Sequence, residues 1–214
     1  ANDDYASDAT RESRKRGIIG SNFWGFGSGW NHDILIGGKY HNGNSTYYES
    51  YTVGDYHHIN GVEEATGYVH PMDKKVYNGY GNGVQVRGVP ENFGDVSPTF
   101  PTLALKPNEH YWEARSSNLV FDNRYAEWMY MGNVSKFWKS TNNGATFVAM
   151  HDFGVNAMVY EIVQSRSNSD VFYAVVQPDG TNAREIYRTA NGGDTWTNCT
   201  DVPTNNRNKL EITI

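Results

Sequence analysis

The sequence predicts an all-β protein built from repeated sheets. Three observations indicate this fold class: the composition favours strands and turns, short apolar stretches alternate with turn signals, and two segments resemble each other at an offset of 49 residues.

The composition is that of strands joined by tight turns. The 214 residues include 18 Val but only 5 Leu, together with 15 Tyr, 23 Asn and 22 Gly. β-Branched and aromatic side chains suit a pleated surface, whereas Asn and Gly accept the positive φ of hairpin turns. Good helix formers are scarce, so substantial helices are not expected.

Hydropathy and charge exclude several classes of protein. The mean hydropathy is −0.68 and no apolar run approaches the ~20 residues of a membrane-spanning helix, so we expect no membrane insertion. The 24 acidic residues outnumber 18 basic ones, which argues against a nucleic-acid partner. Cys199 is the single cysteine of the sequence, so no internal disulfide is possible. We also expect no cofactor.

The chain divides into a short arm and one long β region. Residues 1–16 are polar and carry a basic run, which predicts a solvated N-terminal arm. From residue 17 onward we expect strands at 33–38, 75–80, 128–131, 137–140, 170–176 and 185–189. Residues 209–214 alternate apolar and polar side chains and predict the first strand of a further repeat.

The internal repeat predicts a β-propeller. Residues 137–147 (FWKSTNNGATF) recur as residues 186–196 (IYRTANGGDTW). A weaker echo links residues 70–77, 122–130 and 166–173, each a polar turn that leads into an apolar strand. A period of about 40 to 50 residues with several strands per unit is typical of propeller blades. About four blades are predicted, an incomplete set whose partners are the remaining blades of a larger propeller.

Both repeats resemble the Asp box, or BNR repeat, whose pattern is Ser/Thr-x-Asp-x-Gly-x-Thr-Trp. The pattern is filled by Ser140, Asn142, Gly144, Thr146 and Phe147 in one copy and by Thr189, Asn191, Gly193, Thr195 and Trp196 in the other. Asn replaces Asp in both copies, and Phe replaces Trp in the first. The chain is thus similar, over about 33–214, to Asp-box propellers of the sortilin, xyloglucanase and sialidase type. The resemblance implies that these residues are structural and lie at blade turns away from the ligand site.

The chemistry of the motif agrees with a structural role. An Asn carbonyl accepts backbone N–H groups a few residues onward, and the Gly supplies a positive φ. The aromatic residue after the Thr is expected to pack between sheets.

Aromatic side chains in and beside a Gly-rich region, residues 20–43, are candidate ligand contacts, because exposed Trp and Tyr rings stack on sugars. The alternative is that they fill the wedge between blades. The possible ligand-binding residues are Trp24, Trp30, Tyr40, Tyr47, Tyr48, Asp55 and His57.

Acidic and histidine side chains are densest between residues 55 and 64, at Asp55, His57, His58, Glu63 and Glu64. Their spacing is no metal signature, because neighbouring histidines on a strand face opposite ways, and no metal is expected. Glycoside hydrolysis needs two carboxylates about 5 to 10 Å apart, and the nominal candidates are Asp33, Asp55, Glu63, Glu113 and Glu127. Nothing in the sequence pairs them, so catalytic residues are not assigned.

The preferred hypothesis is a rigid binding or adhesion scaffold of an extracellular or cell-surface protein, with a glycan or an extracellular protein as ligand. A glycoside hydrolase of the xyloglucanase or sialidase type is one alternative, and a protein-docking assembly factor is another. Residues 59–66 lack the Asp of xyloglucanase blade-start motifs, and no arginine lies in a sialidase-like motif. Sequons at Asn44, Asn133 and Asn198 are compatible with secretion.

Overall fold

The computed structural model describes residues 23–39, 43–52, 55–58, 67–80, 83–88, 116–181, 183–200 and 212. At residues 23–25, 39, 79, 80, 83–88 and 116 it describes the backbone only. The N-terminal arm expected at 1–16 lies outside the described residues, as does the strand expected at 209–214 except for Ile212. The amide of Ile212 donates to Oε2 of Glu161 at 3.2 Å.

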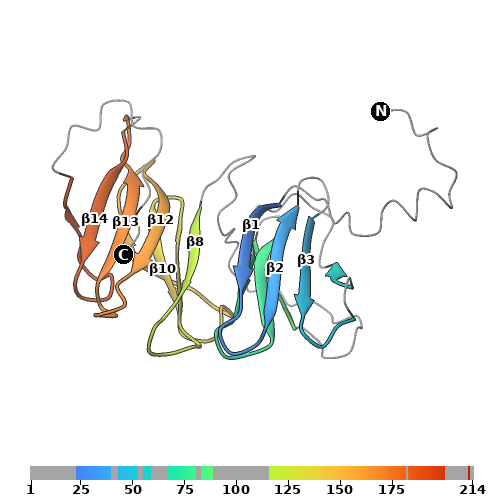
Figure 1. The fold of residues 1–214 in the computed structure, drawn as a ribbon. Helices are drawn as coiled ribbons and strands as arrows, with labels where there is room; N and C mark the ends of the chain where they lie inside the picture. Colours follow the sequence, from blue (N-terminus) through green and yellow to red (C-terminus); the bar gives the residue numbers. More distant parts are fainter. Residues whose placement is uncertain are drawn as a thin grey trace, which may run out of the picture.

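The described residues form four antiparallel sheets, here called blades 1 to 4 (Figure 1). Blade 1 contains β1 (Phe23–Ser28), β2 (Ile34–Lys39), β3 (Gly43–Tyr48) and β4 (His57–His58), and blade 2 contains β5 (Gly67–Val69), β6 (Lys75–Tyr80) and β7 (Gly83–Gly88). Blade 3 contains β8 (Ser116–Phe121), β9 (Met129–Asn133), β10 (Lys136–Ser140) and β11 (Val148–Asp152). Blade 4 contains β12 (Met158–Gln164), β13 (Phe172–Gln177), β14 (Glu185–Thr189) and β15 (Thr197–Asn198).

Each blade is a meander in which successive strands of the chain pair with one another. All six strands expected from the sequence are present, within two residues at their ends: they are β2, β6, β9, β10, β13 and β14. The described part of the chain contains no helix that is long and apolar enough to cross a membrane.

Side-chain alternation gives each blade two faces. Along β13 the cross-strand pairs place Phe172, Ala174 and Val176 on one face, and all three belong to a single buried cluster. This face of blade 4 packs on blade 3, because Tyr130 and Phe137 are part of the same cluster.

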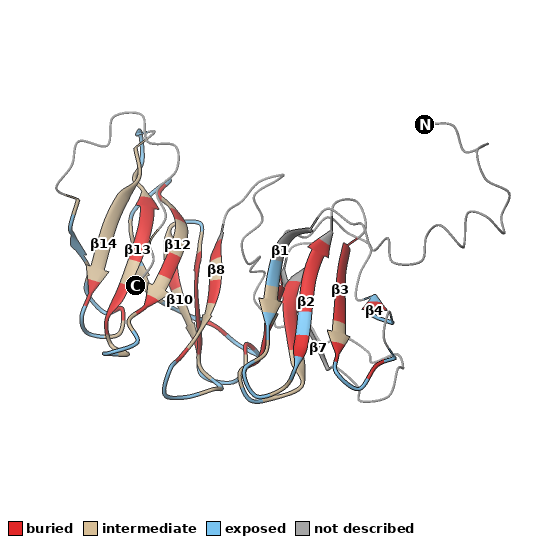
Figure 2. Ribbon diagram, in the orientation of Figure 1, coloured by how far each residue is buried: buried red, intermediate tan, exposed pale blue. Residues whose placement is uncertain are grey.

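The hydrophobic core is divided among the joints between neighbouring blades. Blades 1 and 2 share a cluster that includes Ile34, Ile36 and Val76. Blades 2 and 3 share a second cluster in which Tyr77 meets Met129. A repeat that buries its surface mainly against its neighbours is typical of propellers and solenoids. Figure 2 shows most of the buried residues along the strands and many of the exposed residues at the turns.

The first strands of neighbouring blades lie against each other, β1 against β5 and β8 against β12. The turns after the first strands, β1, β5, β8 and β12, and those after β10 and β14 lie at one end of the molecule. We call this end the turn face; it is the lower end in Figure 1.

Candidate functional site

The two repeated segments occupy equivalent turns of blades 3 and 4. Residues 141–147 connect β10 to β11, and residues 190–196 connect β14 to β15. In blade 3, Oδ1 of Asn142 accepts the Thr146 amide at 2.9 Å, and the Gly144 amide donates to Oγ of Ser140 at 2.9 Å. Both turns therefore lie on the turn face and are closed by local side-chain acceptors.

Blade 4 repeats these bonds atom for atom. Oδ1 of Asn191 accepts the Thr195 amide at 3.0 Å, and the Gly193 amide donates to Oγ1 of Thr189 at 3.2 Å. In both turns the Asn amide group also donates to the Thr hydroxyl at 2.9 Å. The aromatic residue that follows reaches the preceding blade: Phe147 shares a cluster with Tyr77, and Trp196 packs on Phe137.

A second set of turns, between the first and second strands, completes the turn face. The three echoed segments lie here, in blades 2, 3 and 4. One backbone bond recurs in all four blades: Gly29 N to Ile34 O at 2.8 Å, His70 N to Lys75 O at 2.9 Å, Asp122 N to Trp128 O at 3.0 Å, and Ser165 N to Val171 O at 2.9 Å.

Hydrogen bonds connect the turns of this face across the four blades. Asn31 Nδ2 donates to Met72 O at 3.4 Å, which joins blade 1 to blade 2. His70 Nε2 lies 2.9 Å from Asn143 Oδ1, which joins blade 2 to blade 3. Gln164 Nε2 donates to Asp122 Oδ2 at 2.8 Å, which joins blade 3 to blade 4. The turns of this face are therefore connected to one another from blade 1 to blade 4.

Asp122 lies at the joint between blades 3 and 4 and hydrogen-bonds across it. Its buried carboxylate accepts the Arg124 amide at 2.8 Å, the Tyr125 amide at 3.2 Å and the Tyr130 hydroxyl at 2.9 Å, in addition to Gln164. Burial by itself raises the pKa of a carboxyl group, but these donors favour the carboxylate and lower the pKa of Asp122 below its usual value. The Asp122 carboxylate thus satisfies these four donors and has a structural role at the joint.

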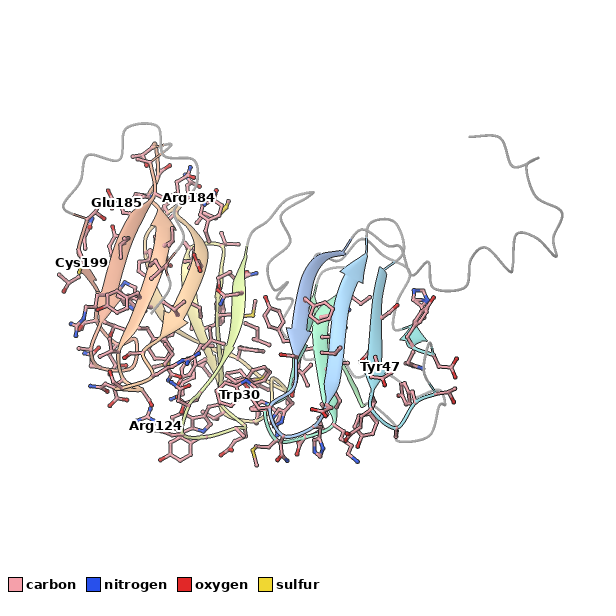
Figure 3. The ribbon with its side chains drawn as sticks, in the orientation of Figure 1. Trp30, Tyr47, Arg124, Arg184, Glu185 and Cys199 are labelled. Atoms are coloured by element: carbon pink, nitrogen blue, oxygen red, sulfur yellow. The ribbon has the colours of Figure 1, made fainter. Side chains whose placement is uncertain are left out.

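Large apolar side chains are exposed on three neighbouring turns of this face. Trp30 is 82% exposed on the turn after β1, Met72 is 55% exposed on the turn after β5, and Tyr125 is 45% exposed on the turn after β8. Figure 3 shows Trp30 and Arg124 at the lower end of the view, the end where these turns lie. We call the first two residues, whose turns are joined by the Asn31 bond, the Trp30–Met72 patch.

The structure distributes the predicted ligand-binding residues unevenly. Trp30 is exposed, whereas Tyr48 is in the core, at a T-shaped contact with Tyr51. Tyr47 is half-buried against the same cluster. The Trp24 side chain and Tyr40 lie outside the described residues.

Three residues of the acidic and histidine cluster are described: Asp55, His57 and His58. His57 and His58 form β4, with His57 buried and His58 exposed, as neighbours on a strand must be. Asp55 is exposed just before them, while Glu63, Glu64 and Glu113 lie outside the described residues. Within the described ranges no three metal-ligating side chains come together.

The described carboxylates proposed for hydrolysis sit on different turns. Asp33 is on the turn after β1, Asp55 precedes β4, and Glu127 is on the turn after β8. Of the sequon residues, Asn44 is buried, Asn133 is half-buried and Asn198 is exposed.

Met72, Asn31 and His70 were not singled out from the sequence. The signal that could have found them is the echo of residues 70–77 in residues 122–130, which aligns His70 with Asp122. In that alignment Met72, two residues after His70, takes a surface position on the turn.

No protein-family model matches the chain, and neither does any curated protein. Among solved structures, an ancestral GH74 enzyme matches with a TM-score of 0.57 and 14% identity, over 83% of this chain and 24% of that chain. The GH74 xyloglucanase from Xanthomonas campestris matches with a TM-score of 0.59 and 12% identity, over 86% and 31%. The Cps50 (Swd1) β-propeller domain from Myceliophteria thermophila matches with a TM-score of 0.53 and 6% identity, over 78% and 52%.

The chain therefore spans about a quarter to a third of the length of the GH74 chains. At these identities the likeness is one of fold. Together with the four antiparallel sheets, it identifies the chain as a partial β-propeller of about four blades.

Proposed function

We propose that the chain is a rigid binding scaffold that holds a neutral glycan on the Trp30–Met72 patch of its turn face. The observation that carries the proposal is the exposure of Trp30, 82%, on a turn fixed by backbone bonds and by Asn31. Trp is the residue most often found as an energetic anchor of binding surfaces. A solvent-exposed indole on a fixed turn loses little entropy when a ligand covers it.

The surroundings of Trp30 favour a sugar over an apolar partner. The same turn carries Asn31 and Asp33, and the facing turn carries Asp73, all polar groups that can bond to hydroxyls. The net charge of −6 disfavours an anionic ligand. The proteins of similar fold include a GH74 xyloglucanase. We therefore choose β-glucan and xyloglucan oligosaccharides as the first ligands to test.

This site lies at the end that also carries the Asp-box-like turns, whereas the family resemblance favours the other end. The reason for preferring the turn face is that Trp30 is 82% exposed there, on a turn held by its backbone bonds and by the Asn31 bond to Met72. An extracellular or cell-surface location remains part of this proposal, supported by the resemblance and by the exposed sequon at Asn198.

The test is a fluorescence titration at pH 7.5 with cello- and xyloglucan oligosaccharides up to millimolar concentration. We expect a saturable change in Trp emission, and we expect Trp30→Ala to weaken binding about 30-fold, which corresponds to a loss of about 2 kcal/mol. Folding is expected to be preserved because the removed side chain makes few contacts.

Tyr56→Ala is the matched control, since Tyr56 is also an exposed aromatic residue of blade 1 but belongs to the segment before β4. It should bind as the unaltered chain does. No fluorescence change at millimolar sugar, or equal binding by the Trp30→Ala variant, would refute the proposal. If the chain binds an extracellular protein and no sugar, the protein-docking alternative is supported.

A glycoside hydrolase is the second candidate, favoured by the GH74 enzymes of similar fold. Its test is the release of reducing sugar from xyloglucan in the same samples. Activity that survives Trp30→Ala but is lost on substitution of a carboxylate would support this candidate over the binding scaffold.

A further inference from the structure

His70 lies directly after β5 and uses both ring nitrogens while being only 3% exposed. Its Nδ1 accepts the Met72 amide at 3.1 Å and the Asp73 amide at 2.8 Å. Because Nδ1 is an acceptor, the proton of the neutral ring is on Nε2, which donates to Asn143 Oδ1 at 2.9 Å. One imidazole thus holds the Met72 turn and joins blade 2 to blade 3.

Asp122 makes the same two bonds in blade 3. Its Oδ1 accepts the amides of Arg124 and Tyr125, which are also the second and third residues after it. A carboxylate at this position remains an acceptor throughout the neutral and mildly acidic range. A histidine does not, because a proton on Nδ1 removes the lone pair that receives both amides.

The groups that face His70 come from three blades. On its own turn Asp73 Oδ2 lies 4.0 Å from Nδ1 and is itself paired with Lys75 at 2.9 Å, while the Tyr77 ring of β6 lies 6.2 Å away. Blade 3 contributes the Phe121 ring at 5.6 Å, Asn143 and the Ala126 backbone, and blade 1 contributes His32 near Asp73.

These surroundings favour the neutral ring. Burial lowers the pKa of His70 below its ordinary 6.5, and Lys75 lowers it further, against the opposing effect of Asp73, Asn143 and Ala126. The folded protein therefore binds this proton less readily than the unfolded chain. The contribution of His70 to stability is complete above about pH 6.5 and is lost as the pH falls from there through the lower folded-state pKa.

We propose that His70 is a positioning residue of the Trp30–Met72 patch, and that a proton on its Nδ1 releases the Met72 turn, so that glycan binding weakens on acidification. The proposal rests on the proposed function of the patch. The proton comes from solvent and occupies the Nδ1 lone pair, so the amides of Met72 and Asp73 lose their acceptor. The Met72 carbonyl, which accepts Asn31 Nδ2 of the Trp30 turn, is then no longer held in place through the Met72 amide.

The test compares the unaltered chain with His70→Asn. The Asn side chain can accept the same two amides, as Asp122 does, but does not titrate. Dissociation constants for cello- or xyloglucan oligosaccharides are measured by fluorescence at pH 7.5, 6.0, 5.0 and 4.5. We expect binding by the unaltered chain to weaken at least five-fold between pH 7.5 and 4.5 and binding by His70→Asn to change less than two-fold. Equal pH dependence in both proteins would overturn the proposal.

A second measurement needs no ligand. NMR spectra should show the amide signals of Met72 and Asp73 moving with the titration of the His70 ring, while the amides of Arg124 and Tyr125 stay unchanged over the same range. If the amide signals of Met72 and Asp73 do not move during the titration while sugar binding is intact, the role of His70 is overturned and the function of the patch is not. Absence of sugar binding at pH 7.5 would overturn the function of the patch and its gating together.

Discussion

Two neighbouring glycines on the turn after β14 meet different surroundings. Both Gly192 and Gly193 have positive φ, 72° and 104°. A Cβ on Gly193 would overlap the ring of Phe137 in the preceding blade, whereas a Cβ on Gly192 would find no atom within 4 Å. Backbone preference therefore requires glycine at both positions, but close packing requires it only at Gly193.

This difference gives a prediction at the scale of single residues. Gly192→Ala should lower the free energy of unfolding by about 1 kcal/mol, because an Ala disfavours positive φ. Gly193→Ala should lower it by about 2–4 kcal/mol, because overpacking against Phe137 is added. Urea unfolding curves of the two variants provide the measurement, and equal losses would show that blade 4 does not pack on blade 3 as described.

The burial of individual aromatic residues could be predicted only in part from the sequence. Tyr47 and Tyr48 are adjacent aromatic residues in one strand, and their local sequence does not show which of the two faces the core. Strand alternation and the packing of blade 2 place Tyr48 in the core and leave Tyr47 half-buried. Trp30 is exposed because it falls on a turn, and its exposure depends on strand ends that the sequence defines only within a few residues.

At the scale of elements, the turns after β10 and β14 were predictable because their bonds are local. Asn142 and Thr146 are four residues apart, and the acceptor, the glycine and the hydroxyl all appear in the sequence pattern. The bond between His70 and Asn143 spans 73 residues, and no local pattern encodes it. The turns of the candidate site could thus be predicted, but the links that fix their relative positions could not.

The Asn in the motif is expected to be replaceable by the Asp of the Asp-box pattern. In Asn142→Asp a carboxylate oxygen still accepts the Thr146 amide, and the Thr146 hydroxyl can donate to the other oxygen. We expect the free energy of unfolding to stay within about 0.5 kcal/mol, whereas Asn142→Ala loses the acceptor and should cost about 1 kcal/mol or more. Urea unfolding measures both.

Thr141→Ala is the control for this series, since Thr141 is exposed in the same turn. It should leave stability unchanged within about 0.5 kcal/mol. A large loss in Asn142→Asp, or none in Asn142→Ala, would show that the side chain at position 142 does not close the turn through its oxygen.

At the scale of the whole molecule, the blades depend on one another. Each hydrophobic cluster lies between two blades, and the hydrogen bonds of the turn face connect the same pairs of blades at one end. Repeats joined in this way derive their stability from nearest-neighbour interfaces. The repeat period predicted this arrangement, because a single sheet cannot bury both of its faces alone. Which turns would carry a ligand did not follow from the period, since all blades share it.

Glycan binding at Trp30 can be tested by the NMR spectrum of the indole N–H groups, which contains one signal for each of the six tryptophans. Cello- or xyloglucan oligosaccharide is added at pH 7.5, and the Trp30 signal is identified by its loss in Trp30→Phe. We expect a saturable shift of the Trp30 signal while the signals of Trp128, Trp138 and Trp196, which are half-buried against the clusters between blades, stay in place. A stationary Trp30 signal, whether or not another tryptophan responds, would contradict glycan binding at Trp30.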